Sequence, residues 1–197
     1  MNFKAKKSTK LVNSLLQKRY VARHLKDIGK YDADTYKHSI RVGTLVADIA
    51  YENGLSEKEV RTLAIAGLLH DLGKCDIPKE IINKKGPLNK SERKEVDKHT
   101  VYGKRRIRDK LLNMVRKIVM HHHDVGSQAG KNVKRRIKRK RGGVPFYTEM
   151  VTAADIFDAL ANERPYKRKF SKTKVATEMQ KEFFGDKKLV AQLIERY

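Results

Sequence analysis

The sequence predicts an all-α fold in a single domain. Apolar residues recur at helical spacing along most of the 197-residue chain, no stretch alternates apolar and polar residues over a useful strand length, and no tandem repeat is visible. A chain of this length fits one domain and can bury a substantial core. We therefore expect successive helices that pack around one core.

The amino-terminal part is expected to begin with a loose basic tail over residues 1–8 and to continue with three helices. These helices are predicted over residues 9–28, 32–52 and 56–72. Gly29 is the predicted end of the first helix, and Gly54 follows the second. The third helix begins at a capping box, Ser56 to Glu59, and is apolar on nearly all sides toward its end. It is therefore the expected central helix.

The remaining chain is expected to form one short helical turn and five further helices. They are predicted over residues 77–82, 91–108, 111–122, 145–161, 173–183 and 186–196. Ser91 is the predicted N-cap of the helix that carries His99 in its middle. Residues 125–143 have no apolar period, and eight of the eleven residues within 131–141 are Lys or Arg. Such a block is usually a solvated loop, and its place after three histidines makes it a candidate electropositive lid.

The charge balance indicates attraction to anions. The chain carries 46 basic and 23 acidic residues, which gives a formal charge of +23, and its sequence pI is about 10.1. Nucleotides, nucleic acid and acidic membrane surfaces are the partners that such a charge attracts. A solubility feature of the source proteome is the alternative explanation, because charge alone carries no sequence code or fold.

The single cysteine and the amino terminus predict a reducing compartment. Cys75 has no partner for an intramolecular disulfide, and it is either a packed small side chain or a stray thiolate ligand. The basic start of the chain lacks the apolar core of a signal peptide, and no apolar run approaches transmembrane length. We therefore expect a cytoplasmic protein without a membrane span.

One short motif suggests metal chemistry. His70 and Asp71 end an apolar helical run, and Lys74 follows three residues after the aspartate. Imidazole nitrogen and carboxylate oxygen suit a divalent metal, and the two carboxylate oxygens can bridge two metals. Lys74 is a fixed cation for an anionic substrate. The alternative is a helix end with a capping histidine and a solvated aspartate, but burying such a pair is costly unless it is paired or binds metal.

Further histidines and carboxylates fall at inward or terminal positions of successive predicted helices. The candidate metal ligands are Asp34, His38, His70, Asp71, His99, His121, His122, His123 and Asp155. Each of them alone is more often a structural residue than a ligand. Helical proteins with dinuclear sites, however, build them from inward carboxylates and histidines on several facing helices. Together the set supplies about seven ligands, enough for two metals with positions left for water or phosphate.

The order of these residues resembles the HD superfamily of metal-dependent phosphohydrolases, and most closely its HD-GYP branch. The stretches that carry the resemblance are HSIRV (38–42), LLHDLGKCDIPKEIINKKGPL (68–88), KHTVYG (98–103) and ADIFDALANERPYK (154–167). It covers about residues 32–170 and implies a helical bundle around a buried dinuclear metal site. We accordingly divide the chain into a tail and helix (1–30), an HD-type core (31–170) and carboxy-terminal helices that pack on the core (171–197).

The resemblance also implies the metals and their ligands. Two divalent ions, commonly iron or manganese, would be bridged by Asp71 and by a water or hydroxide. The implied ligand sets are His38, His70 and Asp155 for one metal, and His99, His122 and His123 for the other. His121 is then the spare member of its run. Asp34 stands where some members place a glutamate that binds a third metal.

The same resemblance implies phosphodiester hydrolysis. Asp71 and Lys74 would be catalytic, and Lys74, Arg164 and Lys167 would hold substrate phosphates. The implied reaction opens a cyclic dinucleotide, cyclic di-GMP, by attack of the metal-bridging hydroxide. One departure concerns the substrate, because Asp124 replaces the family's glutamate and the basic segment 125–143 replaces its Gly-Tyr-Pro loop.

Two alternatives to cyclic dinucleotide hydrolysis therefore stay open. One is a phosphohydrolase that acts on another nucleotide or on nucleic acid, which the net charge favours. The other is a non-catalytic module that binds nucleic acid through the basic loop 131–141 or senses a nucleotide in the pocket.

Overall fold

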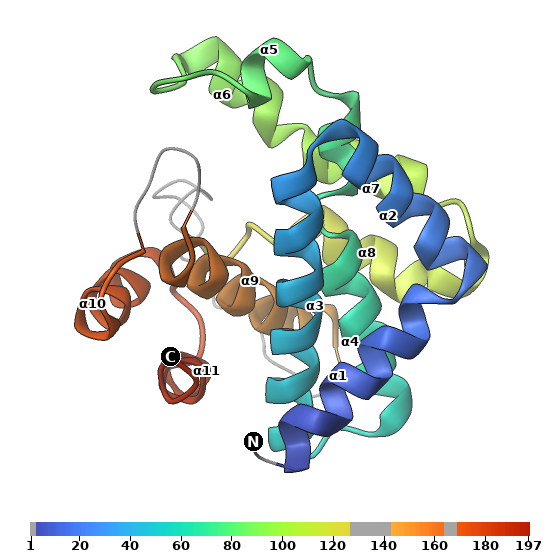
Figure 1. The fold of residues 1–197 in the computed structure, drawn as a ribbon, viewed down its shortest axis with the longest axis vertical. Coiled ribbons are helices and arrows are strands. Elements are labelled where there is room, and N and C mark those ends of the chain that lie inside the picture. The colour runs from blue at the N-terminus through green and yellow to red at the C-terminus, as the bar shows by residue number, and fades with distance from the viewer. Residues whose placement is uncertain (1–2, 127–142, 164–168) are drawn as a thin grey trace.

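The computed structural model describes residues 3–126, 143–163 and 169–197, and these residues form an all-α structure (Figure 1). The α-helices are α1 (Phe3–Leu16), α2 (Arg19–Tyr31), α3 (Ala33–Glu52), α4 (Glu57–Leu69), α5 (Lys79–Ile82), α6 (Lys90–Asp97), α7 (His99–Arg106), α8 (Asn113–His121), α9 (Val144–Ala161), α10 (Lys172–Glu182) and α11 (Lys187–Ile194). Two 3₁₀ helices, η1 (Leu72–Asp76) and η2 (Lys110–Leu112), lie between them. Within these ranges the β structure is one isolated bridge, so the predicted fold class is confirmed.

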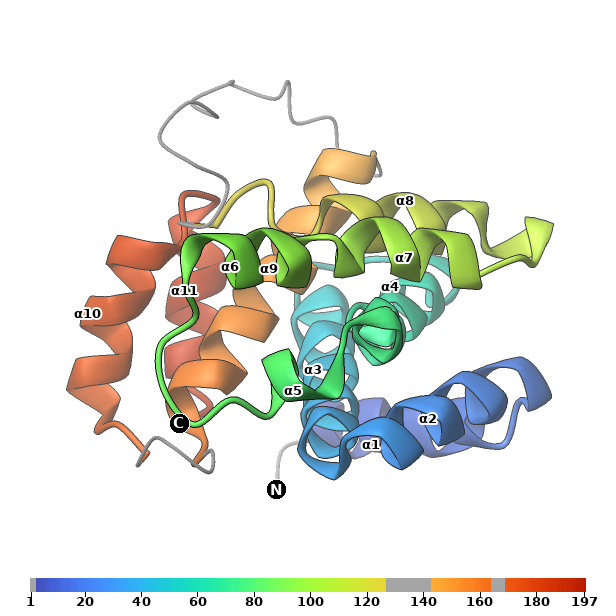
Figure 2. The ribbon, with the colours of Figure 1, turned by 90° about the horizontal axis from the view of Figure 1, so that it is seen from above.

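The core lies between α3 and α4, with the other helices around this pair. Figure 2 shows α7 and α8 on one side of the pair and α1 and α2 on the other, while α9 leads to α10 and α11. The two central helices pack closely, because a Cβ atom added to Gly67 would lie 2.9 Å from the Cα atom of Gly43. Leu63, Leu68 and Leu69 of α4 are fully buried, as the apolar pattern of that helix predicts.

The amino-terminal prediction is wrong in two respects. The predicted tail is already helical from Phe3, and the predicted helix over 9–28 is broken at Lys18, whose backbone is extended. The break lets the apolar faces of both α1 and α2 pack against the core. Gly29 does not end α2; the chain turns at Asp32, which caps α3 by accepting a hydrogen bond from the Thr35 amide at 2.7 Å.

Most other boundaries agree with the sequence pattern to within a few residues. The capping box from Ser56 to Glu59 is present. The predicted helix over 91–108 is instead two helices, α6 and α7, and α6 begins at a capping box made by Asn89 rather than at Ser91. Helices α5 and α6 bury none of their residues and extend away from the core as an arm (Figure 1).

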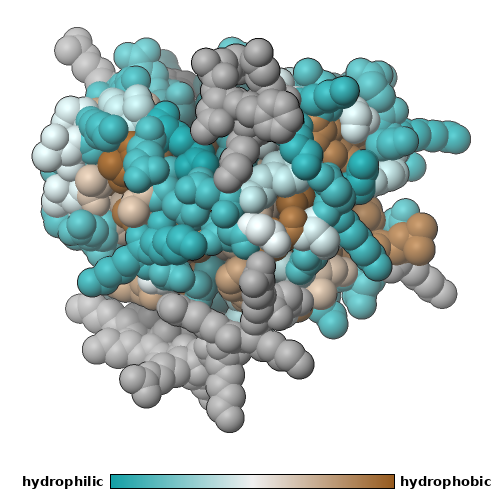
Figure 3. Space-filling view, turned by 90° about the horizontal axis from the view of Figure 1, so that it is seen from below, coloured by the Kyte–Doolittle hydropathy of each residue, from teal (hydrophilic) through white to brown (hydrophobic). Residues whose placement is uncertain are grey.

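The face of the molecule in Figure 3 is mainly hydrophilic where it is coloured. On the face in Figure 3, apolar side chains form small separate patches among polar ones. None of the helices in the described ranges has both the length and the apolar character needed to span a membrane. Most of the predicted basic loop, including residues 131–141, lies outside the described residues.

Candidate metal centre

Seven of the predicted ligand residues come together inside the bundle. They are His38 of α3, His70 and Asp71 after α4, His99 at the start of α7, His122 and His123 after α8, and Asp155 of α9. Their nitrogen and oxygen atoms form three overlapping groups, and within each group the ligand atoms lie within 4.8 Å of one another. Five of the seven residues are buried, and the other two are partly buried.

Helix ends orient three of the histidines in the same way. In each case the ring Nδ1 atom hydrogen-bonds a backbone carbonyl three residues earlier. The pairs are His70 with Gly67 at 2.8 Å, His99 with Val96 at 2.6 Å, and His122 with Val119 at 2.7 Å. Such carbonyls are available because the last turn of a helix lacks intrahelical donors. The break between α6 and α7 is thus what frees the carbonyl that orients His99.

These contacts fix the tautomer of the imidazoles. A carbonyl oxygen only accepts hydrogen bonds, so Nδ1 of His70, His99 and His122 carries the proton and donates it. In the neutral rings of His99 and His122, the Nε2 atom then presents its lone pair to the interior. This is the arrangement in which metal-binding histidines are held by a backbone carbonyl on their other nitrogen.

Carboxylates gather on one side of the centre. His38 Nε2 lies 3.0 Å from Asp155 Oδ1 and 3.8 Å from Asp71 Oδ2. His70 Nε2 lies 3.4 Å from Asp71 Oδ2 and 3.7 Å from Asp155 Oδ1. Two imidazoles and two carboxylates therefore surround one small volume.

Imidazoles gather on the other side. His99 Nε2 lies 3.3 Å from His122 Nε2 and 3.2 Å from His123 Nε2. The second oxygen of Asp71, Oδ1, lies 3.6 Å from His99 Nε2. Asp71 therefore directs one oxygen toward each side, as a carboxylate that bridges two cations must.

The charge states follow from burial and from the neighbouring groups. Burial lowers the pKa of His99 to about 4 and the pKa values of His122 and His123 to about 3, so these rings are neutral at physiological pH. Burial also opposes a charge on His70, but Asp71 and Asp155 outweigh it and raise the pKa of His70 to about 10. Burial disfavours ionised Asp71, yet Lys74 and His70 hold the pKa of this carboxyl well below its ordinary value.

The residues fit bound cations. Within the described part of the chain, His70 Nε2 is buried and has no hydrogen-bond partner. The facing Nε2 atoms of His99 and His122 repel each other unless a cation lies among them. Imidazole and carboxylate donors together suit divalent transition metals.

Three other candidate residues, Asp34, His121 and Cys75, belong to none of the donor groups formed by the described residues. Asp34 is exposed in the first turn of α3. His121 lies outside the centre and hydrogen-bonds Asp124 at 2.8 Å. Arg164 and Lys167 lie outside the described residues. Cys75 packs against the core, and burial raises its thiol pKa to about 11, which favours a packed thiol over a thiolate ligand.

The sequence-based interpretation missed the residues that support the donor residues. Asp158, which is 1% exposed, accepts a hydrogen bond from His38 Nδ1 at 2.7 Å. Thr152 donates a hydrogen bond to the backbone carbonyl of His122. The available signal was a second aspartate, three residues after Asp155, inside an apolar helix.

Comparison with known proteins gives the family. The sequence profile of the HD domain family matches residues 28–183. A cyclic di-GMP phosphodiesterase of Thermotoga maritima is 36% identical over 139 residues, which cover 69% of this chain and 37% of the relative. A 3′3′-cGAMP-specific phosphodiesterase 2 of Vibrio cholerae is 31% identical over 170 residues, which cover 83% of this chain and 32% of the relative. The chain thus spans about a third of the length of these curated relatives.

Solved structures share the fold. The HD domain of the L. monocytogenes phosphodiesterase PgpH, in complex with cyclic-di-AMP, superposes with a TM-score of 0.60 at 17% identity, covering 87% of this chain and 92% of that one. A second structure of the same domain gives a TM-score of 0.59. The order of histidines and aspartates, the helical fold and the profile match agree: this chain belongs to the HD domain family.

Proposed function

We propose that this chain is a metal-dependent phosphodiesterase that hydrolyses a cyclic dinucleotide, with cyclic di-GMP as its substrate. The observation that carries the proposal is the two-sided donor set, in which Asp71 directs one oxygen to each group of imidazoles. The substrate class is supported by relatives named as cyclic di-GMP and 3′3′-cGAMP phosphodiesterases and by a fold neighbour solved with cyclic-di-AMP.

Two divalent cations, iron or manganese, belong to this proposal. One would be held by His38, His70 and Asp155, the other by His99, His122 and His123, and Asp71 would contact both. When bound, such cations lower the pKa of a water molecule and offset negative charge on the phosphoryl group. The buried imidazoles meet the requirement for neutral nitrogen ligands, because burial keeps His99, His122 and His123 uncharged.

Lys74 supplies a cation beside the proposed metals. Its Nζ atom lies 2.6 Å from Asp71 Oδ2, and its side chain is 22% exposed while that of Asp71 is 4% exposed. The ammonium group therefore sits between the buried carboxylate and solvent. From this position it would bind a non-bridging phosphate oxygen and stabilise charge there as the ester bond breaks. Arg164 and Lys167 are the proposed further phosphate ligands.

The choice within the substrate class depends on the segment after the histidine pair. Asp124 follows His123 and hydrogen-bonds His121, so it faces away from the donor groups. The Gly-Tyr-Pro sequence is absent there. A substrate panel therefore has to include the other cyclic dinucleotides beside cyclic di-GMP.

The test is a hydrolysis assay on anaerobically purified protein supplied with Fe(II) or Mn(II). Cyclic di-GMP, 3′3′-cGAMP, cyclic di-AMP and a short single-stranded RNA are incubated separately, and the products are resolved by chromatography. We expect cyclic di-GMP to be opened to the linear dinucleotide, and Asp71→Ala to abolish turnover. Cleavage of RNA alone would instead support the nucleic-acid phosphohydrolase. Protein that holds no metal after supply of Fe(II) or Mn(II), and that turns over none of the four, would support the binding module.

A further inference from the structure

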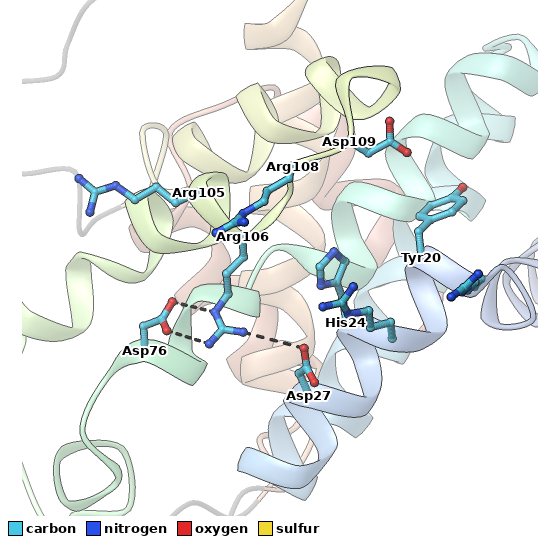
Figure 4. Close-up of a pocket in the computed structure, with 10 residues that line it drawn as sticks. Tyr20, His24, Asp27, Asp76, Arg105, Arg106, Arg108 and Asp109 are labelled. Atoms are coloured by element: carbon cyan, nitrogen blue, oxygen red, sulfur yellow. Dashed lines mark hydrogen bonds and ion pairs between the residues drawn. The ribbon is translucent and has the colours of Figure 1, made fainter.

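A second pocket, separate from the metal centre, lies between α2, η1 and the carboxyl end of α7 (Figure 4). Its volume is about 910 Å³. Five arginines, three aspartates, one tyrosine and one histidine line it, and none of the seven residues of the metal centre is among them. The pocket therefore offers a separate, strongly polar concavity.

Two of the three aspartates in this pocket are already paired. Figure 4 shows Arg106 reaching from α7 between Asp76 and Asp27. Its guanidinium group makes two hydrogen bonds of 2.7 Å to the two carboxylate oxygens of Asp76, and it lies 3.9 Å from Asp27. The third aspartate, Asp109, accepts a hydrogen bond from the backbone amide of Leu111 at 2.8 Å. A single guanidinium group therefore serves two of the three carboxylates.

The lining carries a net positive charge, because five arginines stand against only three aspartates. Arg19, Arg23, Arg105 and Arg108 are all exposed, and none of them forms an ion pair with a residue that the structure describes. Positive groups grouped around one concavity repel one another, and a bound anion relieves that repulsion. The planar guanidinium fork matches phosphate geometry, which makes phosphate the preferred anion for such a group.

The α2 wall of the pocket adds aromatic surface. Tyr20 and His24 lie four residues apart on α2, and Figure 4 shows both along the side of the helix that borders the pocket. Burial raises the pKa of Tyr20 and lowers the pKa of His24, so both rings are uncharged at neutral pH. Aromatic rings beside arginines are the combination on which nucleobases stack while phosphates bind.

We propose that this pocket binds a nucleotide-sized phosphate ester, with Arg23 of α2 and Arg108 beyond α7 holding the phosphates and Tyr20 and His24 lying beside the base. The volume is that of a small-molecule site rather than of an extended surface. A small nucleotide is therefore favoured over a nucleic-acid strand. The site does not depend on the proposed hydrolytic activity, because it shares no residue with the metal centre.

The test is calorimetric titration of the metal-free 197-residue chain with adenosine 5′-triphosphate and with inorganic pyrophosphate, in the presence of EDTA. We expect each ligand to bind the Asp71→Asn variant as tightly as it binds the unaltered chain. Arg23→Ala combined with Arg108→Ala is expected to weaken binding at least tenfold. The matched control is Lys187→Ala combined with Lys188→Ala, which removes two exposed positive charges from α11 and is expected to change affinity by less than twofold.

Three results would overturn the site. These are no binding by the unaltered chain at millimolar ligand, an equal loss in both double variants, or a loss in Asp71→Asn that matches the loss in the arginine variant. Preferential binding of a 20-nucleotide RNA, lost equally in both double variants, would assign the charge to an extended nucleic-acid surface instead. Should the alanine variant fail to fold, Arg23→Gln with Arg108→Gln takes its place.

Discussion

At the scale of single residues, Asp158 determines how His38 faces the metal centre. Its Oδ2 atom accepts a hydrogen bond from His38 Nδ1, while Arg41 Nε and Asn162 Nδ2 bind its Oδ1 atom at 2.7 and 2.9 Å. Burial disfavours the ionised carboxylate, but His38 and Arg41 outweigh burial and lower its pKa. A charged, fixed acceptor therefore holds the imidazole with Nε2 toward Asp155.

Replacing Asp158 with asparagine tests this positioning role. The asparagine amide has one oxygen and one NH₂ group. Its NH₂ group would therefore face either the Arg41 guanidinium or His38 Nδ1, and in both cases two hydrogen-bond donors would face each other. We expect metal affinity to fall about 10- to 100-fold, as is usual when the hydrogen-bond partner of a metal ligand is lost. Competition with a chelator measures this affinity, and excess metal should restore turnover. The control is Asp109→Asn at an exposed position, which should change neither metal affinity nor turnover. Unaltered metal affinity in Asp158→Asn would contradict the positioning role of Asp158.

The sequence indicates the donor residues of the centre but not the residues that support them. His38, His70 and Asp71 fall on inward faces or helix ends whose periodicity can be read directly. Asp158 also lies in an apolar helix, but nothing in the spacing says that it bonds a residue of α3, 120 positions earlier. Hydrogen bonds that hold a donor residue depend on tertiary contacts, and periodicity carries no information about those contacts.

At the scale of elements, η1 and α7 approach so closely that only glycine fits between them. A Cβ atom on Gly73 would lie 1.9 Å from the carbonyl oxygen of His99 and 2.4 Å from the amide nitrogen of Gly103. Both neighbours are backbone atoms, so no side-chain rotation relieves the clash. This contact joins the element that follows Asp71 to the helix that begins with His99, and hence joins the two sides of the centre.

Gly73→Ala is expected to separate these elements. We predict a loss of about 1–3 kcal/mol in the free energy of unfolding, the usual cost of overpacking, together with weaker metal binding. Thermal unfolding followed by circular dichroism measures the change. Gly29→Ala is the control, because the atom nearest to its Cβ would belong to the Tyr36 side chain, at an ordinary contact distance of 3.4 Å, inside a helix where alanine is favoured. Equal stability of the two variants would argue against the close contact.

Helix boundaries show which signals in the sequence are strong. The capping box at Ser56 correctly marks a helix start, because the side chain and backbone satisfy each other locally. The predicted helix end at Gly29 is wrong, because a glycine inside a helix is only mildly unfavourable and the chain instead turns at Asp32, which caps α3. The break before His99 carried no local signal, since its benefit is the orientation of that ring toward the centre.

At the scale of the whole molecule, the charge states of the centre make stability depend on pH when metal is absent. The native pKa values of His99, His122 and His123 lie below the ordinary 6.5, at about 4, 3 and 3. Their contribution to stability is present above about pH 6.5 and is lost as the pH falls from there toward 3. The native pKa of His70 is raised to about 10, so its contribution is present below pH 6.5 and is lost as the pH rises through 10.

We therefore expect the metal-free protein to be most stable near pH 6.5. Its melting temperature in EDTA, measured by differential scanning fluorimetry between pH 4 and 10, should fall on both sides of this maximum. Added Mn(II) should remove the loss at high pH, because a bound cation takes the place of the proton on His70. A metal-free stability that rises steadily to pH 10 would contradict the assigned charge states.

The global architecture was accessible from the sequence because long amphipathic helices leave few ways to bury their apolar faces. Convergence of the donors was also accessible, because residues that face inward on successive helices of one bundle must meet near its centre. The pocket between α2 and α7 was not, since it depends on how Arg106 is neutralised by Asp76 of another element.

Metal content measured on the anaerobically purified protein tests the central claim most directly. Elemental analysis after loading with Fe(II) or Mn(II) and removal of loosely bound ions should give two equivalents per chain, and Asp71→Ala should hold fewer than one. Retention of two equivalents by Asp71→Ala, or none by the unaltered protein, would contradict a centre in which Asp71 serves both cations.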